Sequence, residues 1–193
     1  MRRAPRLPAV ATLIAGLCYP LAFAPWQWYP VGWVVLIPLF LAAEADPPRI
    51  RLRRGFLFGA GAFGMGLHWL LPTIHTFGNM PLGLAVPTWA LLVVYCALYP
   101  ALFTWLGGRL GGRPAVRFLL GLPLLWAGLE ALRGALFTGF PWLTTGVSQL
   151  GGPLDGLLPV GGVLGTGLAV AVINGALAWA LREGDQRRIA GVG

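Results

Sequence analysis

Two oppositely charged residues, Glu130 and Arg133, stand in an apolar stretch of the chain, where charge is costly. They are three residues apart, so a helix would place them on one face. A charged side chain at the centre of a bilayer costs about 2.5–3.5 kcal/mol on insertion scales. Two interpretations follow: a structural ion pair that ties this helix to a neighbour, or an Arg133 that faces a cavity and holds a phosphate or carboxylate in its planar fork.

The two histidines of the chain, His68 and His75, lack the neighbours that a metal site requires. No Cys, Asp or Glu lies between them, whereas a structural zinc site takes about four ligands. We expect His68, beside Trp69, to make a hydrogen-bonded contact between helices. His75 is the better candidate for a binding site, because it lies in a polar loop with Asn79 and two threonines. The sequence therefore predicts neither a metal ion nor a cofactor.

No set of residues has the arrangement of covalent catalysis, which needs a nucleophile with a base in reach. Cys18 and Cys96 lie inside apolar segments, where we expect small buried residues without a disulfide or metal role. The polar loops offer Ser148, His75 and Asp155, as many polar loops would. The residues alone predict a lipid-facing or substrate-gating scaffold with no catalytic residue.

The elements that must position these residues are membrane helices. Of the 193 residues, 57% are hydrophobic and 10% are charged, with a mean hydropathy of +0.74, whereas a soluble domain carries about 25% charged residues. A membrane span needs about 20 mostly apolar residues. We predict an all-α, polytopic integral membrane bundle in one domain, residues 1–193, with no soluble catalytic domain. The expected spans are residues 8–24, 28–43 (kinked at Pro38), 55–72, 84–106, 118–136 and 157–181.

All fourteen basic residues are arginine, and thirteen of them fall on one side of the six predicted transmembrane helices. They precede the first span, separate spans two and three, separate spans four and five, and follow span six: Arg2, Arg3, Arg6, Arg49, Arg51, Arg53, Arg54, Arg109, Arg113, Arg117, Arg182, Arg187 and Arg188. Because cytoplasmic loops carry the excess of basic residues, both termini are predicted to be cytoplasmic. This segregation explains the net charge of +8 without a nucleic-acid partner.

The opposite loops, residues 25–30, 72–83 and 137–156, hold no arginine and are rich in aromatic and polar residues. Such side chains suit the headgroup region of a membrane. Any chemistry is therefore expected at this outer, extracytoplasmic face.

Two pairs of glycines have the spacing of close contacts between membrane helices. Gly55 and Gly59 lie in the third expected span, and Gly161 and Gly165 lie in the sixth. The second pair belongs to the run GGVLGTG, which lacks the Gly-Lys-Ser/Thr ending of a phosphate loop. Helix packing is therefore predicted for both pairs.

Four motifs follow one another along the chain: LAFAPW (21–26), TFGNMP (76–81), LRGALFTGFPWL (132–143) and SQLGGPLDGLLPVGGV (148–163). With them, residues 7–190 or so resemble the membrane domain of apolipoprotein N-acyltransferase, the bacterial enzyme family that adds the last acyl chain to lipoproteins. RGALFTGFPW followed by SQLGGPL is the specific part of this resemblance, whereas LAFAPW alone is weak.

The resemblance implies a cytoplasmic N-terminus, eight spans in the whole family member, and an extracytoplasmic nitrilase-like domain between spans seven and eight. A Glu-Lys-Cys triad in that domain takes an acyl group from phospholipid and passes it to the N-terminal cysteine of a lipoprotein. This chain has no lysine, and its cysteines lie in early spans, so no catalytic residue carries over. The chain ends where a seventh span would begin, so we expect a fragment, a truncated product or half of a split enzyme.

What the resemblance carries over is a lipid- and lipoprotein-binding platform at the outer ends of the spans. We expect Arg133 to hold a phosphate, and Trp142 and Phe140 to line an acyl path. The candidate binding residues, including the two polar candidates above, are Glu130, Arg133, Phe140, Pro141, Trp142, Gln149, His75, Phe77 and Asn79. The predicted partners are phospholipid, diacylated lipoprotein and a nitrilase-like domain in cis or in trans, at the bacterial inner membrane.

Two other classes of function stay open. A catalytically silent binding or assembly subunit would pair with a separate catalytic chain. A small transporter would show internal repeats and helices broken near the midplane. The first and second sets of three spans show no such repeat, and the polar groups crowd one face instead.

Overall fold

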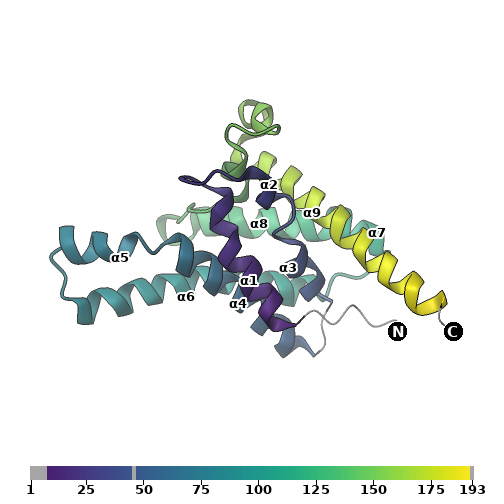
Figure 1. The fold of residues 1–193 in the computed structure, drawn as a ribbon, viewed down its shortest axis with the longest axis horizontal. Coiled ribbons are helices and arrows are strands. Elements are labelled where there is room, and N and C mark those ends of the chain that lie inside the picture. Colours follow the sequence, from purple (N-terminus) through teal and green to yellow (C-terminus); the bar gives the residue numbers. More distant parts are fainter. Residues whose placement is uncertain (1–7, 45–46, 192–193) are drawn as a thin grey trace.

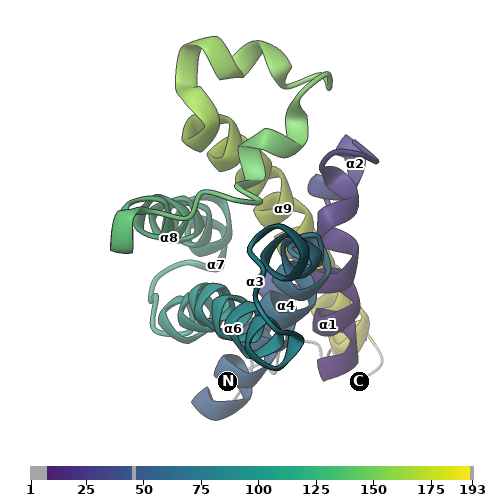
Figure 2. The same cartoon turned by 90° about the vertical axis from the view of Figure 1, so that its left-hand side faces the viewer.

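The computed structural model describes residues 8–44 and 47–191, and that part of the chain folds into helices and turns without a strand. α4 and α6 lie side by side, α9 crosses the molecule obliquely, and the connection between α8 and α9 rises above the other elements (Figures 1 and 2). The helices are α1 (Ala9–Cys18), α2 (Tyr29–Gly32), α3 (Ile37–Ala42), α4 (Pro48–Gly66), α5 (Leu70–Pro72), α6 (Leu82–Gly107), α7 (Pro114–Val116), α8 (Leu122–Ala135) and α9 (Leu158–Gly191).

Among the described residues, three segments are long and apolar enough to cross a bilayer: Leu82–Gly107, Pro114–Thr138 and Asp155–Gly184. A fourth arises if α4 and Leu70–Phe77, which are bent by 58° at a short break, count as one span. The first two expected spans form the shorter apolar helices Ala9–Ala22 and Tyr29–Ala42. The predicted helical membrane architecture is confirmed, whereas six crossings and cytoplasmic termini stay predictions.

The second expected span is broken into α2 and α3, and the break lies one turn earlier than the predicted kink at Pro38. Pro38 stands in the first turn of α3, where its missing N–H would have no helical partner anyway. The backbone groups released by the break are bound by Asn174 of α9. Its Oδ1 accepts from the Leu36 N–H at 3.0 Å, and its Nδ2 donates to the Gly32 carbonyl at 2.8 Å.

The third expected span is also interrupted, between α4 and α5. The backbone leaves the helical conformation at Leu67, and Pro72, which has no N–H to donate to the carbonyl of His68, removes one helical bond just after this point. Trp89 of α6 donates its indole N–H to the carbonyl of Leu67 at 2.9 Å, which satisfies one group that the break exposes. The chain then continues through α5 and a wide helical turn, Thr73–Phe77, toward α6.

The first predicted glycine pair packs as expected. A Cβ on Gly55 would collide with the carbonyl of Pro100, and one on Gly59 would lie 2.6 Å from the Cα of Ala97. α4 and α6 therefore touch backbone to backbone. Gly16 brings α1 equally close to the backbone of α4 on another side.

The second predicted pair does not make such a contact. Gly165 has no neighbour within 4 Å of where its Cβ would lie, and Gly161 meets only a backbone nitrogen at 3.9 Å. α9 is interrupted between them at Gly162, whose backbone is non-helical with a φ of 63°. Gly167 and Gly175 make the close contacts of α9 instead, with the backbones of Gly146 and the segment before α8.

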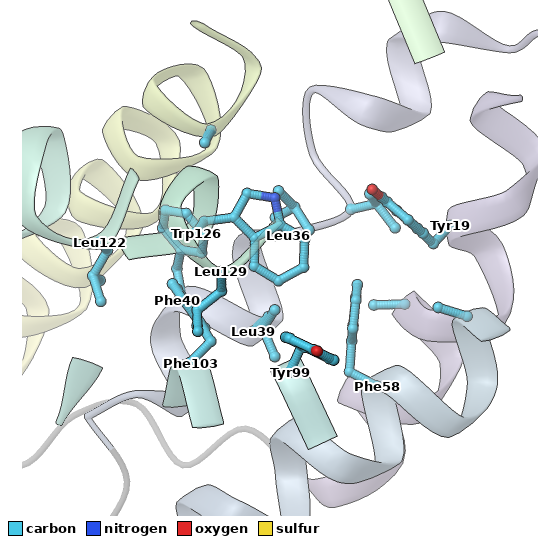
Figure 3. Close-up of a cluster of buried hydrophobic side chains, with 14 of the residues drawn as sticks. Tyr19, Leu36, Leu39, Phe40, Phe58, Tyr99, Phe103, Leu122, Trp126 and Leu129 are labelled. Carbon is cyan, nitrogen blue, oxygen red and sulfur yellow. The ribbon is translucent and has the colours of Figure 1, made fainter. Parts of the chain in front are cut away.

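Aromatic side chains from several helices meet in the centre of the molecule (Figure 3). Trp126 of α8 packs edge-on against Phe103 of α6 and Phe58 of α4, with ring centroids 5.4 and 6.4 Å apart. Phe40 of α3 packs at a tilt against Phe103, with ring centroids 5.1 Å apart. This cluster fixes α3, α4, α6 and α8 around one core.

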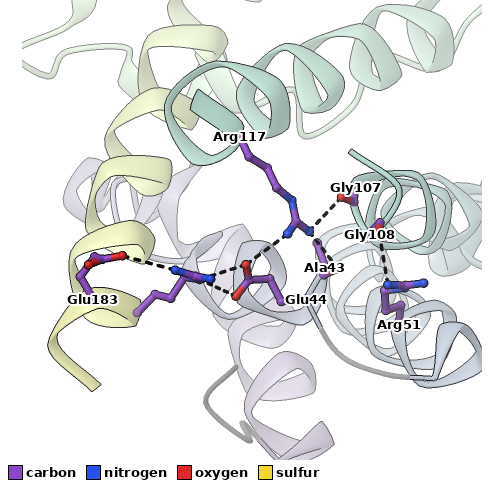
Figure 4. A network of polar contacts seen from close by, with 8 residues as sticks. Ala43, Glu44, Arg51, Gly107, Gly108, Arg117 and Glu183 are labelled. Carbon is purple, nitrogen blue, oxygen red and sulfur yellow. Dashed lines mark hydrogen bonds and ion pairs between the residues drawn. The ribbon is translucent and has the colours of Figure 1, made fainter. Parts of the chain in front are cut away.

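At the end of the bundle that carries the arginines, a single carboxylate joins three elements (Figure 4). Glu44, just after α3, accepts from Arg117 before α8 at 3.1 Å and from Arg182 of α9 at 2.8 Å. Arg117 also donates to the Gly107 carbonyl at the end of α6. Membrane topology alone accounted for these arginines in the sequence. In the structure, Arg117 and Arg182 also hold helix ends together.

Candidate functional site

A groove of about 650 Å³ opens where three connecting segments meet. One wall comes from the turn after α1, a second from the break between α4 and α5, and a third from the loop after α8. Its lining residues are Pro20, Phe23, Ala24, Pro25, Trp26, Met65, Gly66, His68, Trp69, Pro141, Trp142, Leu143 and Val147. The volume and the apolar lining suit a ligand such as an acyl chain, because small-molecule sites span about 300–1,000 Å³.

The aromatic walls of the groove contact one another across the chain. Trp142 lies 6.0 Å from Trp69 between ring centroids and stacks on Phe140 at 5.4 Å. Trp26 completes the lining from the first connection, and all three tryptophans are partly exposed. Two of the motifs that carry the family resemblance, LAFAPW and LRGALFTGFPWL, thus converge on one surface.

Arg133 holds the loop that presents Trp142. Its Nη1 donates to the carbonyls of Phe140 and Trp142, each at 2.6 Å, and the Phe140 N–H returns a bond to the Arg133 carbonyl at 2.9 Å. The guanidinium lies 5.1 Å from the ring centroid of Phe63, and the residue is only 2% exposed. Such charge-assisted bonds are about twice as strong as neutral ones, so they can hold the tight turn after α8.

Glu130 anchors a later part of the same loop, at Thr145. It does not form the ion pair with Arg133 that their spacing in the sequence suggested. Its Oε1 accepts from both the backbone N–H and the hydroxyl of Thr145, each at 2.8 Å. No ion pair joins it to Arg133 within the described residues, because Arg133 is turned toward the two carbonyls. Trp126 also donates to the Thr145 hydroxyl at 2.8 Å, and Tyr19 lies at the same distance from it.

Gln149 is fully buried behind the groove and does not line it. Its Oε1 accepts from the indole N–H of Trp33 at 2.8 Å, and its Nε2 donates to Ser148 at 2.9 Å. The bond with Trp33, and a longer one from Nε2 to the Tyr29 carbonyl at 3.4 Å, attach the loop between α8 and α9 to α2 and the residue after it. Of the predicted binding residues, Pro141 and Trp142 therefore line the groove, whereas Glu130, Arg133 and Gln149 support the loop that forms one of its walls.

The second predicted cluster, around His75, lies apart from the groove. It occupies the connection between α5 and α6, which projects from the rest of the molecule (Figure 1). His75 bonds through Nδ1 with the Met80 carbonyl at 2.8 Å, and Phe77 is 83% exposed. Asn79 adopts a left-handed backbone with a φ of 50°, which this residue type tolerates.

His68 departs from its expected role as a contact between helices. The residue is exposed, its Nδ1 bonds with the Met65 carbonyl of the same segment at 2.7 Å, and its ring lines the groove. The break after α4 turns His68 outward, and the spacing of residues along a helix does not predict such a break. Among the residues that the structure describes, no three His, Cys, Asp or Glu side chains gather in a way that could hold a metal ion.

Sequence reasoning missed several supporting residues. The sequence indicated Trp26 only as an aromatic residue at the membrane interface and Trp69 only as the neighbour of His68. It predicted no role for Thr145 or Asn174. Their signal is polarity: a threonine or an asparagine in an apolar segment needs a hydrogen-bonding partner. Which partner it takes depends on elements more than a hundred residues away in the case of Asn174.

The helices and the groove define a class: a helical membrane protein with an apolar, tryptophan-lined groove at one end of its bundle. A sequence model of the family described as "Apolipoprotein N-acyltransferase N-terminal domain" matches residues 15–176. The chain belongs to this family.

Curated relatives agree with this assignment. The chain is 42% identical over 175 residues to the apolipoprotein N-acyltransferase of Coxiella burnetii, a match that covers 88% of this chain and 35% of the relative. It is 42% identical over 184 residues to that of Methylococcus capsulatus (91% and 35%) and 38% identical over 173 residues to that of Vibrio cholerae (89% and 34%). The chain thus spans about a third of the length of these relatives.

Proposed function

We propose that this chain forms the lipid- and lipoprotein-binding platform of an apolipoprotein N-acyltransferase, and that acyl chains enter its tryptophan-lined groove. The observation that carries this proposal is the convergence of two family motifs on one apolar groove of about 650 Å³. The hydrocarbon tail of an acyl chain has no hydrogen-bonding groups, and His68 is the one ionisable side chain among the lining residues. The groove therefore offers an acyl chain contact without burying unpaired charge.

The groove would face the outside of the bacterial inner membrane. In this arrangement the chain crosses six times, with Ala9–Ala22 and Tyr29–Ala42 as short or bent crossings and with both termini in the cytoplasm. Support comes from Glu44, Arg117 and Arg182, which gather the arginine-rich ends of several helices at one end of the bundle. Positive residues accumulate on the cytoplasmic side of membrane proteins.

The acyl transfer itself would take place in another part of the complete enzyme. The family resemblance implies a nitrilase-like domain that takes an acyl group from phospholipid and passes it to a lipoprotein. The match covers only 35% of each of these two relatives, which leaves ample length for such a domain. We propose that it acts in cis or in trans on substrates that the groove holds near the membrane surface.

The test replaces the matching third of the Methylococcus capsulatus relative with this chain and follows lipoprotein acylation by mass spectrometry in cells that depend on the chimera. The unaltered chimera should acylate lipoproteins. Trp142→Ala removes a groove wall and should slow acylation about tenfold, as truncation of a binding-site tryptophan commonly does. Trp28→Ala is the matched control, because Trp28 is exposed in the first connection and does not line the groove.

Two results would contradict the platform role. One is an unaltered chimera that reaches the membrane at normal levels and transfers nothing. The other is equal acylation by the Trp142→Ala and Trp28→Ala chimeras at equal protein levels. Acylation restored by co-expressing the remaining two thirds of the relative as a separate chain would favour action in trans.

A further inference from the structure

The start of α4 meets the end of α6 at the arginine-rich end of the bundle (Figures 1 and 4). Arg51 of α4 donates to the Gly108 carbonyl at 3.4 Å, and its own carbonyl accepts from the hydroxyl of Thr104 at 2.8 Å. Two turns further along α4, Gly59 packs on the backbone of Ala97. The contacts follow opposite orders along the two helices, so α4 and α6 are antiparallel.

The residues that follow these contact positions turn to one exposed side of the helix pair. Each step along a helix rotates the side chain by about 100°, and in antiparallel neighbours this step leads to the same side of both. Leu52 of α4 stands one residue after such a contact, as do Leu98, Trp105 and Arg109 of α6. Leu52, Leu98 and Arg109 are exposed, and Trp105 is half-buried.

The exposed face of α6 changes in character along its length. Leu91, Leu98 and Trp105 follow one another at intervals of seven residues, and Arg109 comes one turn later. The guanidinium of Arg109 lies over the indole of Trp105, 3.4 Å from the ring centroid. Hydrocarbon, interface and headgroups follow in the same order through one leaflet of a membrane. The arginine therefore stands at the depth of lipid headgroups.

α4 contributes basic residues in an arrangement that is unfavourable for the helix itself. Its first two turns carry Arg49, Arg51, Arg53 and Arg54, and its first turn holds no acidic residue. A helix N-terminus favours anions over cations, and like charges four residues apart, such as Arg49 and Arg53, repel each other. Both are exposed and form no ion pair in the described part of the chain. An anion from outside the protein would offset this repulsion.

The carboxylates that the structure describes at this end are held elsewhere. Glu44 lies between Arg117 and Arg182. Glu183 pairs with Arg182 at 3.4 Å. Arginines outnumber carboxylates by ten to four in the segments that make up this end of the bundle, which are residues 44–54, 107–117 and 182–188.

We propose that the surface formed by Arg49, Leu52, Leu98, Trp105 and Arg109 binds a phospholipid whose headgroup carries a net negative charge. The two arginines contact the headgroup, and the acyl chains lie along the exposed leucines of α6. Charge complementarity identifies the headgroup, since basic sites beside membrane helices bind anionic lipids. The exposed leucines favour a lipid over a nucleic acid, which has no acyl chain to cover them. The inference is independent of the groove, which lies at the other end of α4.

The experiment uses the full 193-residue chain in micelles of an uncharged detergent and measures lipid binding by native mass spectrometry. The probes are dioleoylphosphatidylglycerol and dioleoylphosphatidylcholine, which share their acyl chains and a phosphate and differ in net charge. An arginine near a membrane surface strengthens the attraction of an anionic lipid about fivefold, so two of them predict a preference of about 25-fold for phosphatidylglycerol. Arg49→Gln combined with Arg109→Gln should reduce this preference to about twofold or less.

Two further double variants separate the site from net charge and from folding. Arg187→Gln with Arg188→Gln is the matched control, because it removes the same charge from the last turns of α9. This control should keep a preference of at least about tenfold. Arg49→Lys with Arg109→Lys keeps both charges and should stay within about threefold of the unaltered chain.

Four results would contradict the inference. Equal binding of the two lipids to the unaltered chain would overturn the site. Equal losses in the two glutamine double variants would reduce the preference to net charge and would also overturn it. Loss of the preference in the lysine variant would contradict charge as the basis of recognition. A short single-stranded RNA that displaces phosphatidylglycerol, through the same two arginines, would overturn the assignment to a lipid.

Discussion

Asn174→Leu is the sharpest test of how the broken second helix is held. The side chain is completely buried, and it bonds at once to the Leu36 N–H and to the Gly32 carbonyl. These two backbone groups belong to opposite sides of the break between α2 and α3. Leucine has the same branched shape as asparagine and a larger volume, so the substitution removes the bonds without opening a cavity.

The expected loss of stability follows from counting the groups left without a partner. An unsatisfied buried donor or acceptor costs about 1–3 kcal/mol, and Asn174→Leu leaves two of them, at Leu36 and Gly32. The added apolar contact returns about 1 kcal/mol. We therefore expect Asn174→Leu to lower the free energy of unfolding by about 3 kcal/mol.

The assay is equilibrium unfolding in detergent micelles, followed by near-ultraviolet circular dichroism of the tryptophans. Leu177→Ala on the outward face of α9 is the control, since Leu177 is 40% exposed, and it should cost less than about 1 kcal/mol. Amide hydrogen exchange at residues 33–36 should quicken in Asn174→Leu alone. A variant within about 0.5 kcal/mol of the unaltered protein would refute the role of Asn174 as a bridge across the break.

Two further predictions concern the packing that positions the groove. Gly59→Val forces side-chain atoms into the backbone contact between α4 and α6 and should cost about 1–3 kcal/mol. Gly64→Ala on the same helix has no neighbour within 4 Å and should leave the thermal midpoint unchanged. Glu44→Gln removes the carboxylate shared by two partly buried arginines and should cost about 3 kcal/mol in the same unfolding assay. Glu183→Gln, at a more exposed pair, should cost less than about 1 kcal/mol; equal losses would contradict a special role for Glu44.

How far the fold could be predicted differs between elements. The structure contains helices close to the predicted spans 84–106, 118–136 and 157–181. Long apolar runs strongly favour helices, because a helix makes its backbone hydrogen bonds within itself. The spans at 28–43 and 55–72 are broken. Prolines indicated that a kink was possible there, but where each helix breaks depends on Asn174 and Trp89, which come from other helices.

The glycine pairs show the same limit. Both have identical spacing, yet the first packs against α6 while the second stands open beside an interruption of α9. Spacing places two glycines on one face of a helix, but it does not determine whether another helix lies there.

For the candidate site, the sequence by itself determined the class of protein, the family motifs and the segregation of arginine to one set of loops, since composition and local order carry these properties. Only the tertiary structure decided that Trp26, Trp69 and Trp142 share a groove, because they come from three separate connections. It also decided the partner of Arg133. Residues three apart on a helix were free to pair, but the loop folded back and offered two carbonyls at closer range. Hydrogen bonds form between groups that the whole fold brings together, and helical spacing alone does not say which groups those are.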